Sequence, residues 1–172
     1  GIDSALTAYI AARALDPENV LTVFMPSRYT SRDNFTDTRQ LADNLGAGYR
    51  EIPIDEIFTA FTNVLSPDFK ENDPGVTEQN FQARIRGTLL MGISNAQGHL
   101  VLSTGNKSEM AIGYSTLYGD MNGGLSVISD VPKTLVWELS RYINREREII
   151  PQRIIDKVPS AELKPDQTDQ DD

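Results

Sequence analysis

The chain has 172 residues, 39% hydrophobic and 24% charged, which is enough for one core of ordinary size. Its 16 Lys and Arg against 25 Asp and Glu give a formal net charge of -9, which argues against nucleic acid or an anionic membrane as the main partner. The absence of cysteine excludes disulfides, thiolate zinc sites and cysteine nucleophiles, and it is compatible with a reducing cytosol, the location that we expect.

The chain opens on Gly1-Ile2-Asp3-Ser4, followed by apolar residues at helical spacing. This is typical of a phosphate-binding turn, because glycine permits close approach and the free N–H groups at a helix start favour an anion. Asp and Ser are also common helix caps, so an ordinary cap is the alternative. The abrupt start predicts missing sequence before Gly1, including a strand, so we expect one empty sheet position and an inactive isolated chain.

Further along, apolar runs predict strands, and amphipathic segments between them predict helices. The strands are expected at 20–25, 49–54 and 99–103, and the helices around 35–45, 57–65 and 81–93, with Gly46 as a C-terminal cap. Strands and helices that alternate at this spacing predict right-handed crossovers and a parallel sheet with ligands at the carboxyl ends of its strands.

Loops and a last helix complete the chain. Polar or glycine-rich composition predicts loops at 66–77 and 114–124, and Leu135, Leu139 and Tyr142 mark an amphipathic helix. Residues 164–172 are nearly all polar, and we expect a mobile tail.

The segment 103–109, Ser-Thr-Gly-Asn-Lys-Ser-Glu, follows the third predicted strand at a ligand-binding edge. An ordinary capping turn, with Thr104 or Asn106 as the cap, is the alternative interpretation. If this turn and the opening turn follow neighbouring strands, Asp3 and Glu109 bring two carboxylates to one phosphate site. Mg²⁺ is bound by such carboxylates together with substrate phosphates.

Six motifs together resemble one family. The opening turn is similar to the ATP-pyrophosphatase loop SGGxDS without its first two residues. The other five are similar, in order and spacing, to the synthetase domain of NAD synthetase: residues 80–86 (NFQARIR), 103–109 (STGNKSE), 117–120 (LYGD), 130–134 (DVPKT) and 159–163 (PSAEL). They resemble the glutamine-dependent branch, in which a glutaminase domain precedes this one, whereas the ammonia-dependent branch usually has Lys in place of Leu117.

The resemblance implies a fold and a reaction. The fold is an α/β fold of the adenine-nucleotide α-hydrolase type, three-layer α/β/α with a parallel sheet, truncated at both ends. Residues 1–163 would form a partial ATP-pyrophosphatase domain, and 164–172 a mobile tail or lid. The enzyme, a C–N ligase, would convert deamido-NAD to NAD through an adenylate, releasing AMP and pyrophosphate, with ammonia from the glutaminase domain; we also expect a homo-oligomer. Two rivals stay open: a GMP synthetase-like amidotransferase and a non-catalytic nucleotide-binding module.

The resemblance also implies site residues. Those for ATP are Gly1, Ile2, Asp3, Ser4, Met25, Thr104, Lys133 and Ser160, and those for deamido-NAD are Asn80, Arg84 and Glu109. Asp3 and Lys133 would be catalytic, and Asp3 and Glu109 would hold Mg²⁺. Lys133 lies in the first turn of a predicted helix, where a cation is disfavoured, and an anionic ligand would explain it.

Overall fold

A computed structural model of the chain describes residues 1–65 and 75–164. The predicted alternation of strands and helices is confirmed. In chain order, the elements are α1 (Ile2–Ala14), the 3-10 helix η1 (Pro17–Asn19), β1 (Leu21–Phe24), α2 (Arg32–Leu45), β2 (Gly48–Glu51), α3 (Asp55–Leu65), α4 (Val76–Gln97), β3 (Leu102–Ser103), α5 (Lys107–Ile112), β4 (Leu125–Ser126), α6 (Lys133–Ile143) and α7 (Gln152–Asp156).

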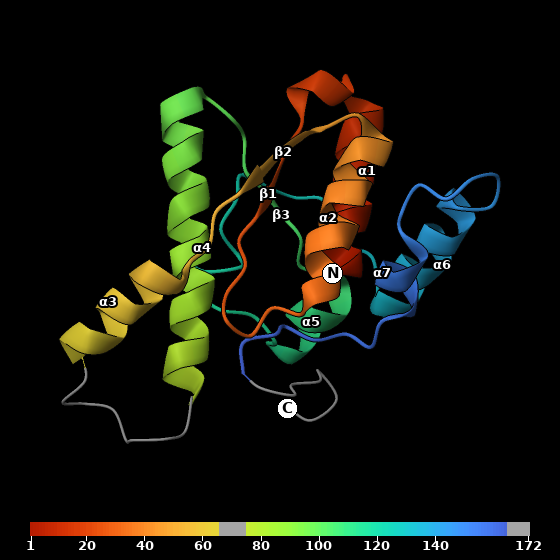
Figure 1. The fold of residues 1–172 in the computed structure, drawn as a ribbon. Helices are drawn as coiled ribbons and strands as arrows, with labels where there is room; N and C mark the ends of the chain where they lie inside the picture. The colour runs from red at the N-terminus through yellow and green to blue at the C-terminus, as the bar shows by residue number, and fades with distance from the viewer. Residues whose placement is uncertain (66–74, 165–172) are drawn as a thin grey trace.

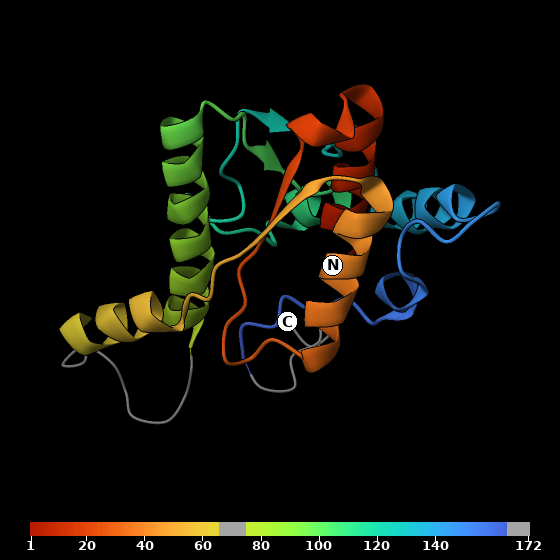
Figure 2. The same cartoon turned by 45° about the horizontal axis from the view of Figure 1, so that its top comes forward.

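The strands lie between two groups of helices. Figures 1 and 2 show α3 and α4 on one side of the strands and α1 and α2 on the other. β1 pairs with β2 in parallel and β3 pairs with β4 in parallel, so the expected α/β fold with parallel strands is confirmed. Within the described residues the four strands form two separate two-stranded sheets.

The boundaries differ from the prediction in a few places. The second strand ends at Glu51, before Pro53, which has no N–H to donate to a ladder. The third strand is limited to Leu102–Ser103, because its partner β4, which was not predicted, is only two residues long. Val76 and Thr77 begin α4 and do not belong to the predicted loop, whose residues 66–74 lie outside the described ranges. The expected tail or lid at 164–172 also lies outside them, except for Lys164.

The main core fixes the beginning of α1. Ile2 and Leu6 of α1 are buried in this core together with Leu41 from α2, Val136 from α6 and Ile155 from α7. A second, smaller cluster joins α3 to α4. The predicted cap at Gly46 is confirmed, since this glycine has a left-handed φ of 69° at the end of α2. The first turn of α1 is therefore held against α6 by apolar packing.

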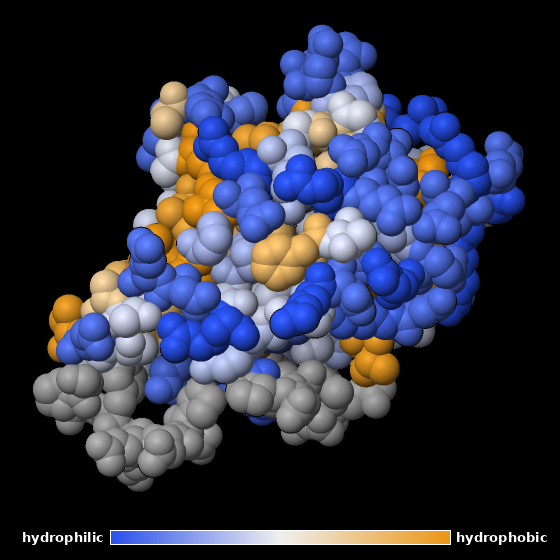
Figure 3. Space-filling view, viewed as in Figure 1, coloured by the Kyte–Doolittle hydropathy of each residue, from blue (hydrophilic) through white to orange (hydrophobic). Residues whose placement is uncertain are grey.

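Apolar side chains also reach the surface. On the face shown in Figure 3 they gather over α4 and the outer end of α3, and the exposed hydrophobic residues of these helices are Phe61, Val64, Leu65, Val76 and Met91. Exposed apolar patches of this kind are common where proteins associate. None of the helices in the described ranges has both the length and the apolar composition needed to cross a membrane.

Candidate active site

The opening turn forms the start of α1, as the sequence predicted. Gly1 is the N-terminal cap, and the Ser4 hydroxyl donates a hydrogen bond of 2.9 Å to the Gly1 carbonyl. The Ile2 side chain is buried in the core, so only the backbone of Ile2 can face a ligand. Asp3 is the one acidic side chain in the first turn of this helix.

Both oxygens of the Asp3 carboxylate are held by residues distant in sequence. The Lys133 ammonium forms an ion pair with Oδ2, and the Asn106 side-chain amide donates a hydrogen bond of 2.9 Å to Oδ1. The Asp3 and Lys133 side chains are only 16% and 18% exposed. A partly buried pair of this kind is screened by water less than a surface pair.

Glu109 joins the same group. Its Oε1 lies 3.6 Å from Lys133 Nζ, and its Oε2 accepts a hydrogen bond of 3.2 Å from the Asn106 backbone N–H. Burial and, next, the charge of Asp3 raise the pKa of the Glu109 carboxyl above its ordinary value. Two carboxylates thus share one ammonium, which leaves a net charge of about -1 when all three groups are ionised.

Asn106 was predicted from the sequence only as a candidate helix cap and not as a site residue. It is fully buried and caps α5, because its side-chain oxygen accepts a hydrogen bond of 3.0 Å from the Glu109 backbone N–H. The capping interpretation was therefore correct, but the same amide group also bridges to Asp3. Asn followed three residues later by Glu is the visible signal for the cap, whereas nothing local indicates the contact across 103 positions.

Lys133 begins α6, where a cation was expected to need an anionic ligand. The structure offers another compensation, because Asp3 and Glu109 surround the ammonium. The Lys133 backbone N–H donates a hydrogen bond of 3.0 Å to the Ser108 hydroxyl, which ties the starts of α5 and α6 together. The ammonium also lies 5.8 Å from the centre of the Trp137 ring.

Asp3 and Glu109 fit a divalent cation as a partial ligand set. In the described part of the chain, no group of three or more His, Asp or Glu residues converges on a common point. Mg²⁺ does not require one, because it is usually held by one or two carboxylates, water and substrate phosphates. Two carboxylates that touch the same lysine and the same asparagine supply that number.

Asn80 and Arg84 lie on one face of α4, as their spacing predicted, and they meet the loop 114–124. The Asn80 side-chain oxygen accepts a hydrogen bond of 2.8 Å from the Thr116 hydroxyl, and Arg84 Nε donates one of 3.2 Å to the Leu117 carbonyl. Glu109 does not contact these two residues in any described hydrogen bond or ion pair. Its described partners are Asn106 and Lys133.

The contacts described for Met25 and Ser160 are made with residues other than Asp3, Glu109 and Lys133. Arg86 Nε donates a hydrogen bond of 3.0 Å to the Met25 carbonyl, just beyond β1, and burial lowers the pKa of this arginine to about 10. The Ser160 hydroxyl accepts a hydrogen bond of 3.1 Å from the Glu162 backbone N–H. The described contacts do not bring either residue to Asp3 or Lys133.

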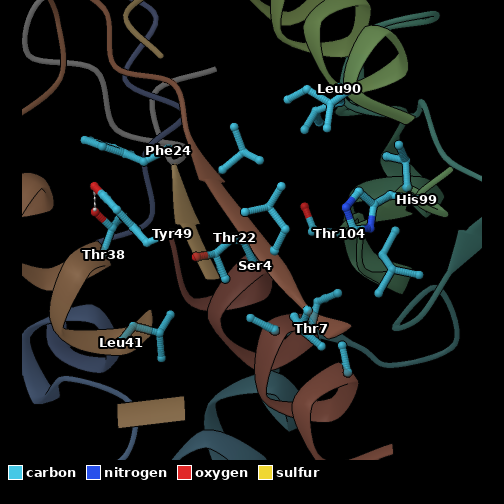
Figure 4. Close-up of a pocket in the computed structure, with 18 of the residues that line it drawn as sticks. Ser4, Thr7, Thr22, Phe24, Thr38, Leu41, Tyr49, Leu90, His99 and Thr104 are labelled. Atoms are coloured by element: carbon cyan, nitrogen blue, oxygen red, sulfur yellow. Dashed lines mark hydrogen bonds between the residues drawn. The ribbon is translucent and has the colours of Figure 1, made fainter. Parts of the chain in front are cut away.

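A cavity of about 350 Å³ separates the two sheets (Figure 4). β1 lines one side of it and residues 99–102 line the other, with Gly1, Ser4 and Thr104 at its border. Most of its lining is apolar, and the Asp3, Glu109 and Lys133 side chains do not belong to it. The charged group therefore lies outside this cavity, at the joined starts of α1, α5 and α6.

The fold and this charged group define a class: an α/β protein with parallel strands whose polar residues gather at helix N-termini, the arrangement used to bind nucleotide phosphates. The family model described as NAD synthase matches residues 1–172. The chain belongs to the NAD synthase family.

Individual relatives agree with this assignment. The chain is 56% identical to the glutamine-dependent NAD(+) synthetase of Synechocystis sp., over 99% of this chain and 31% of that protein. The structure of glutamine-dependent NAD+ synthetase from Acinetobacter baumannii in complex with ADP has a TM-score of 0.88 at 48% identity, over 95% of this chain and 32% of that one. NMN synthetase from Francisella tularensis has a TM-score of 0.87 at 30% identity, over 99% and 67%. The chain thus spans about a third of the length of the curated relatives it matches.

Proposed function

We propose that the chain is the synthetase part of a glutamine-dependent NAD synthetase, which amidates deamido-NAD to NAD at the expense of ATP. The observation that supports this most directly is the convergence of Asp3, Glu109 and Lys133 at the starts of three helices, where the phosphates of a nucleotide find N–H donors and charge. The ADP bound to the similar A. baumannii enzyme agrees with a nucleotide at this fold.

The reaction consists of two displacements. The nicotinate carboxylate of deamido-NAD attacks the α-phosphorus of ATP, and the bond to pyrophosphate breaks. Ammonia then attacks the carbonyl carbon of the resulting adenylate, AMP leaves, and the nitrogen loses a proton to give the amide. No side-chain nucleophile is needed, so this chain's part is to position the substrates and to balance charge.

Each ATP-side residue has a part in that task. The backbone N–H groups at Gly1, Ile2 and Ser4 would receive phosphate oxygens, and the Lys133 ammonium would balance charge as pyrophosphate leaves. Asp3 and Glu109 would hold Mg²⁺, which when bound neutralises phosphate charge. We assign Thr104, which lines the same cavity as Ser4, to ATP as well.

Three further ligand contacts are part of the proposal. Met25 follows β1, and its backbone would border the adenine next to Arg86, which binds the Met25 carbonyl. Ser160 would contact ATP from the segment after α7. Asn80 and Arg84 would hold deamido-NAD against the loop 114–124, because a planar cation suits a carboxylate or phosphate of that substrate.

We infer the wider setting from the relatives. Ammonia would come from a glutaminase domain, as the names of the glutamine-dependent relatives suggest. The apolar surface over α3 and α4 supports a homo-oligomer. We propose a cytoplasmic location, which is compatible with a sequence that contains no cysteine.

The similarity to NMN synthetase favours one alternative, amidation of the mononucleotide instead of the dinucleotide. The two reactions share the ATP side, so Asp3, Glu109 and Lys133 do not separate them. The two reactions differ in the substrate that is amidated, because the dinucleotide carries a second nucleotide that the mononucleotide lacks.

A product assay on the full-length protein tests the proposal. With ATP, Mg²⁺ and ammonia, we expect deamido-NAD to yield NAD with one AMP and one pyrophosphate for each amide formed. Nicotinate mononucleotide in place of deamido-NAD should react at less than about a tenth of the rate, because it forgoes the binding energy of the second nucleotide. Asp3→Asn is the negative control. Faster amidation of the mononucleotide would favour the alternative, and ATP binding without turnover would favour a non-catalytic module.

Arg84 should serve the dinucleotide and not ATP. In the full-length protein, Arg84→Ala is expected to raise the KM for deamido-NAD about tenfold or more while the KM for ATP changes less than about threefold. Arg147→Ala, which removes an exposed cation elsewhere, is the matched control and should leave both constants unchanged. Equal rises in both constants would instead indicate that Arg84 only supports the loop 114–124.

A further inference from the structure

The segment that follows α7 is fastened to two helices that are distant in sequence. Figures 1 and 2 show it running from α7 past the start of α2. The Glu162 carboxylate accepts hydrogen bonds from the Ser31 backbone N–H at 3.3 Å and from the Asn34 side-chain amide at 2.7 Å. One residue further, the Leu163 carbonyl accepts a hydrogen bond of 2.8 Å from Gln82 on α4.

A lysine closes this arrangement into a network of four residues, Ser31, Asn34, Lys157 and Glu162. Lys157 Nζ lies 2.5 Å from Glu162 Oε1, and it also donates to Ser31 Oγ at 2.8 Å and to Asn34 Oδ1 at 3.3 Å. The Glu162 side chain is only 17% exposed. The carboxylate is thus charge-paired and hydrogen-bonded, as a partly buried ion must be.

The backbone at Glu162 is also constrained. Its φ is 51°, in the left-handed region that a residue with a Cβ rarely adopts without compensating contacts. The same residue donates its backbone N–H to the Ser160 hydroxyl at 3.1 Å. The conformation that the carboxylate contacts maintain therefore also orients Ser160.

The network joins two segments of the proposed ATP side. Ser31 caps α2 and ends the loop that begins at Met25, while Ser160 lies in the segment after α7. Asn34 lines the same cavity as Gly1 and Ser4 of the phosphate turn. The hydrogen bonds and the ion pair described for Glu162 join the segment after α7 to the start of α2, and through these contacts the residue would influence ATP binding.

We propose that Glu162 is a positioning residue that, paired with Lys157, fixes the Ser160 segment against the start of α2 and so sets the affinity for ATP. This inference rests on the proposed function, because Ser160 is taken as an ATP contact. It assigns Glu162 and Lys157 no direct contact with substrate.

Direct ATP titration of the full-length protein tests the proposal. Glu162→Ala is expected to raise the Kd of ATP about tenfold, because the charged hydrogen bonds that hold Ser160 are lost. Lys157→Met should have a similar effect, and the double variant should bind no more weakly than the weaker single one, since both changes break the same network. Glu138→Ala removes an exposed carboxylate on α6 and is the matched control, with unchanged affinity.

Hydrogen exchange is a further readout, which distinguishes a local positioning role from a general loss of structure. In hydrogen exchange of the ligand-free protein, Glu162→Ala should speed exchange at 31–34 and 158–164 and leave α4 unchanged. An unchanged Kd of ATP, or additive effects of the two changes, would overturn the proposal, as would a loss of protection throughout the chain. If the parent protein binds ATP but forms no amide, the proposed function fails while the affinity ratios still decide the role of Glu162. A parent protein that does not bind ATP would overturn both.

Discussion

Replacing Lys133 by methionine is expected to reduce turnover of the full-length protein at least about a hundredfold. This ammonium is the cation that touches both Asp3 and Glu109, at the point where the proposed reaction develops negative charge on pyrophosphate. Removing one preorganised stabilising group from such a site typically lowers kcat by about 10²–10³. Methionine keeps an unbranched apolar stem that is one atom shorter, so the main change is the loss of the ammonium and of its contacts with Asp3, Glu109 and the Trp137 ring.

The variant has a second expected consequence. Without Lys133 no cation offsets the repulsion between the two carboxylates, so the pKa of Glu109, which burial already raises, should rise further. Steady-state kinetics at saturating ATP and deamido-NAD measure the effect, with the melting temperature showing that the fold persists. Arg141→Met removes an exposed cation from the last turn of the same helix and should keep normal turnover. Turnover of Lys133→Met within about threefold of the parent would mean that the ion pairs are structural only.

Local chemistry was enough to predict most of the elements. Apolar residues at helical spacing marked α2, α3, α4 and α6, and a glycine with a left-handed φ ends α2 where the sequence indicated. The short strands were harder, because β3 and β4 pair over only two residues each and β4 has no alternation to detect. Pairing of this length depends on the tertiary surroundings and not on the propensity of the two residues.

The candidate site likewise has some features that the sequence predicted and others that only the structure shows. The types and order of Asp3, Glu109 and Lys133 were visible in the sequence, and the structure brings these three side chains together. The bridge from Asn106 to Asp3 spans 103 positions, and no periodicity of either segment encodes it. The Glu162 network depends on a non-glycine residue with positive φ, which composition cannot reveal.

A glycine pair on α4 offers a test of how the loop 114–124 is held. A Cβ at Gly87 would lie 2.4 Å from Asn122 Nδ2 and 2.8 Å from the Gly119 carbonyl oxygen, whereas one at Gly92 would meet nothing within 4 Å. Alanine stabilises a helix by about 1 kcal/mol more than glycine does, so both substitutions gain the same helix propensity. Only at Gly87 does the new methyl group displace a backbone atom, and overpacking of this kind typically destabilises by about 1–3 kcal/mol.

Gly92→Ala should therefore raise the melting temperature by a few degrees at most, and Gly87→Ala should lower it, since about 1 kcal/mol shifts the midpoint by roughly 2–4 °C in a domain of this size. Gly87→Ala should also speed hydrogen exchange across 114–124, because the loop must retreat from α4. The retreat separates Thr116 from Asn80 and the Leu117 carbonyl from Arg84. The KM for deamido-NAD should then rise in Gly87→Ala alone. Equal melting temperatures and exchange rates for the two variants would show that the loop tolerates the added methyl group and is not seated on α4 by this close approach.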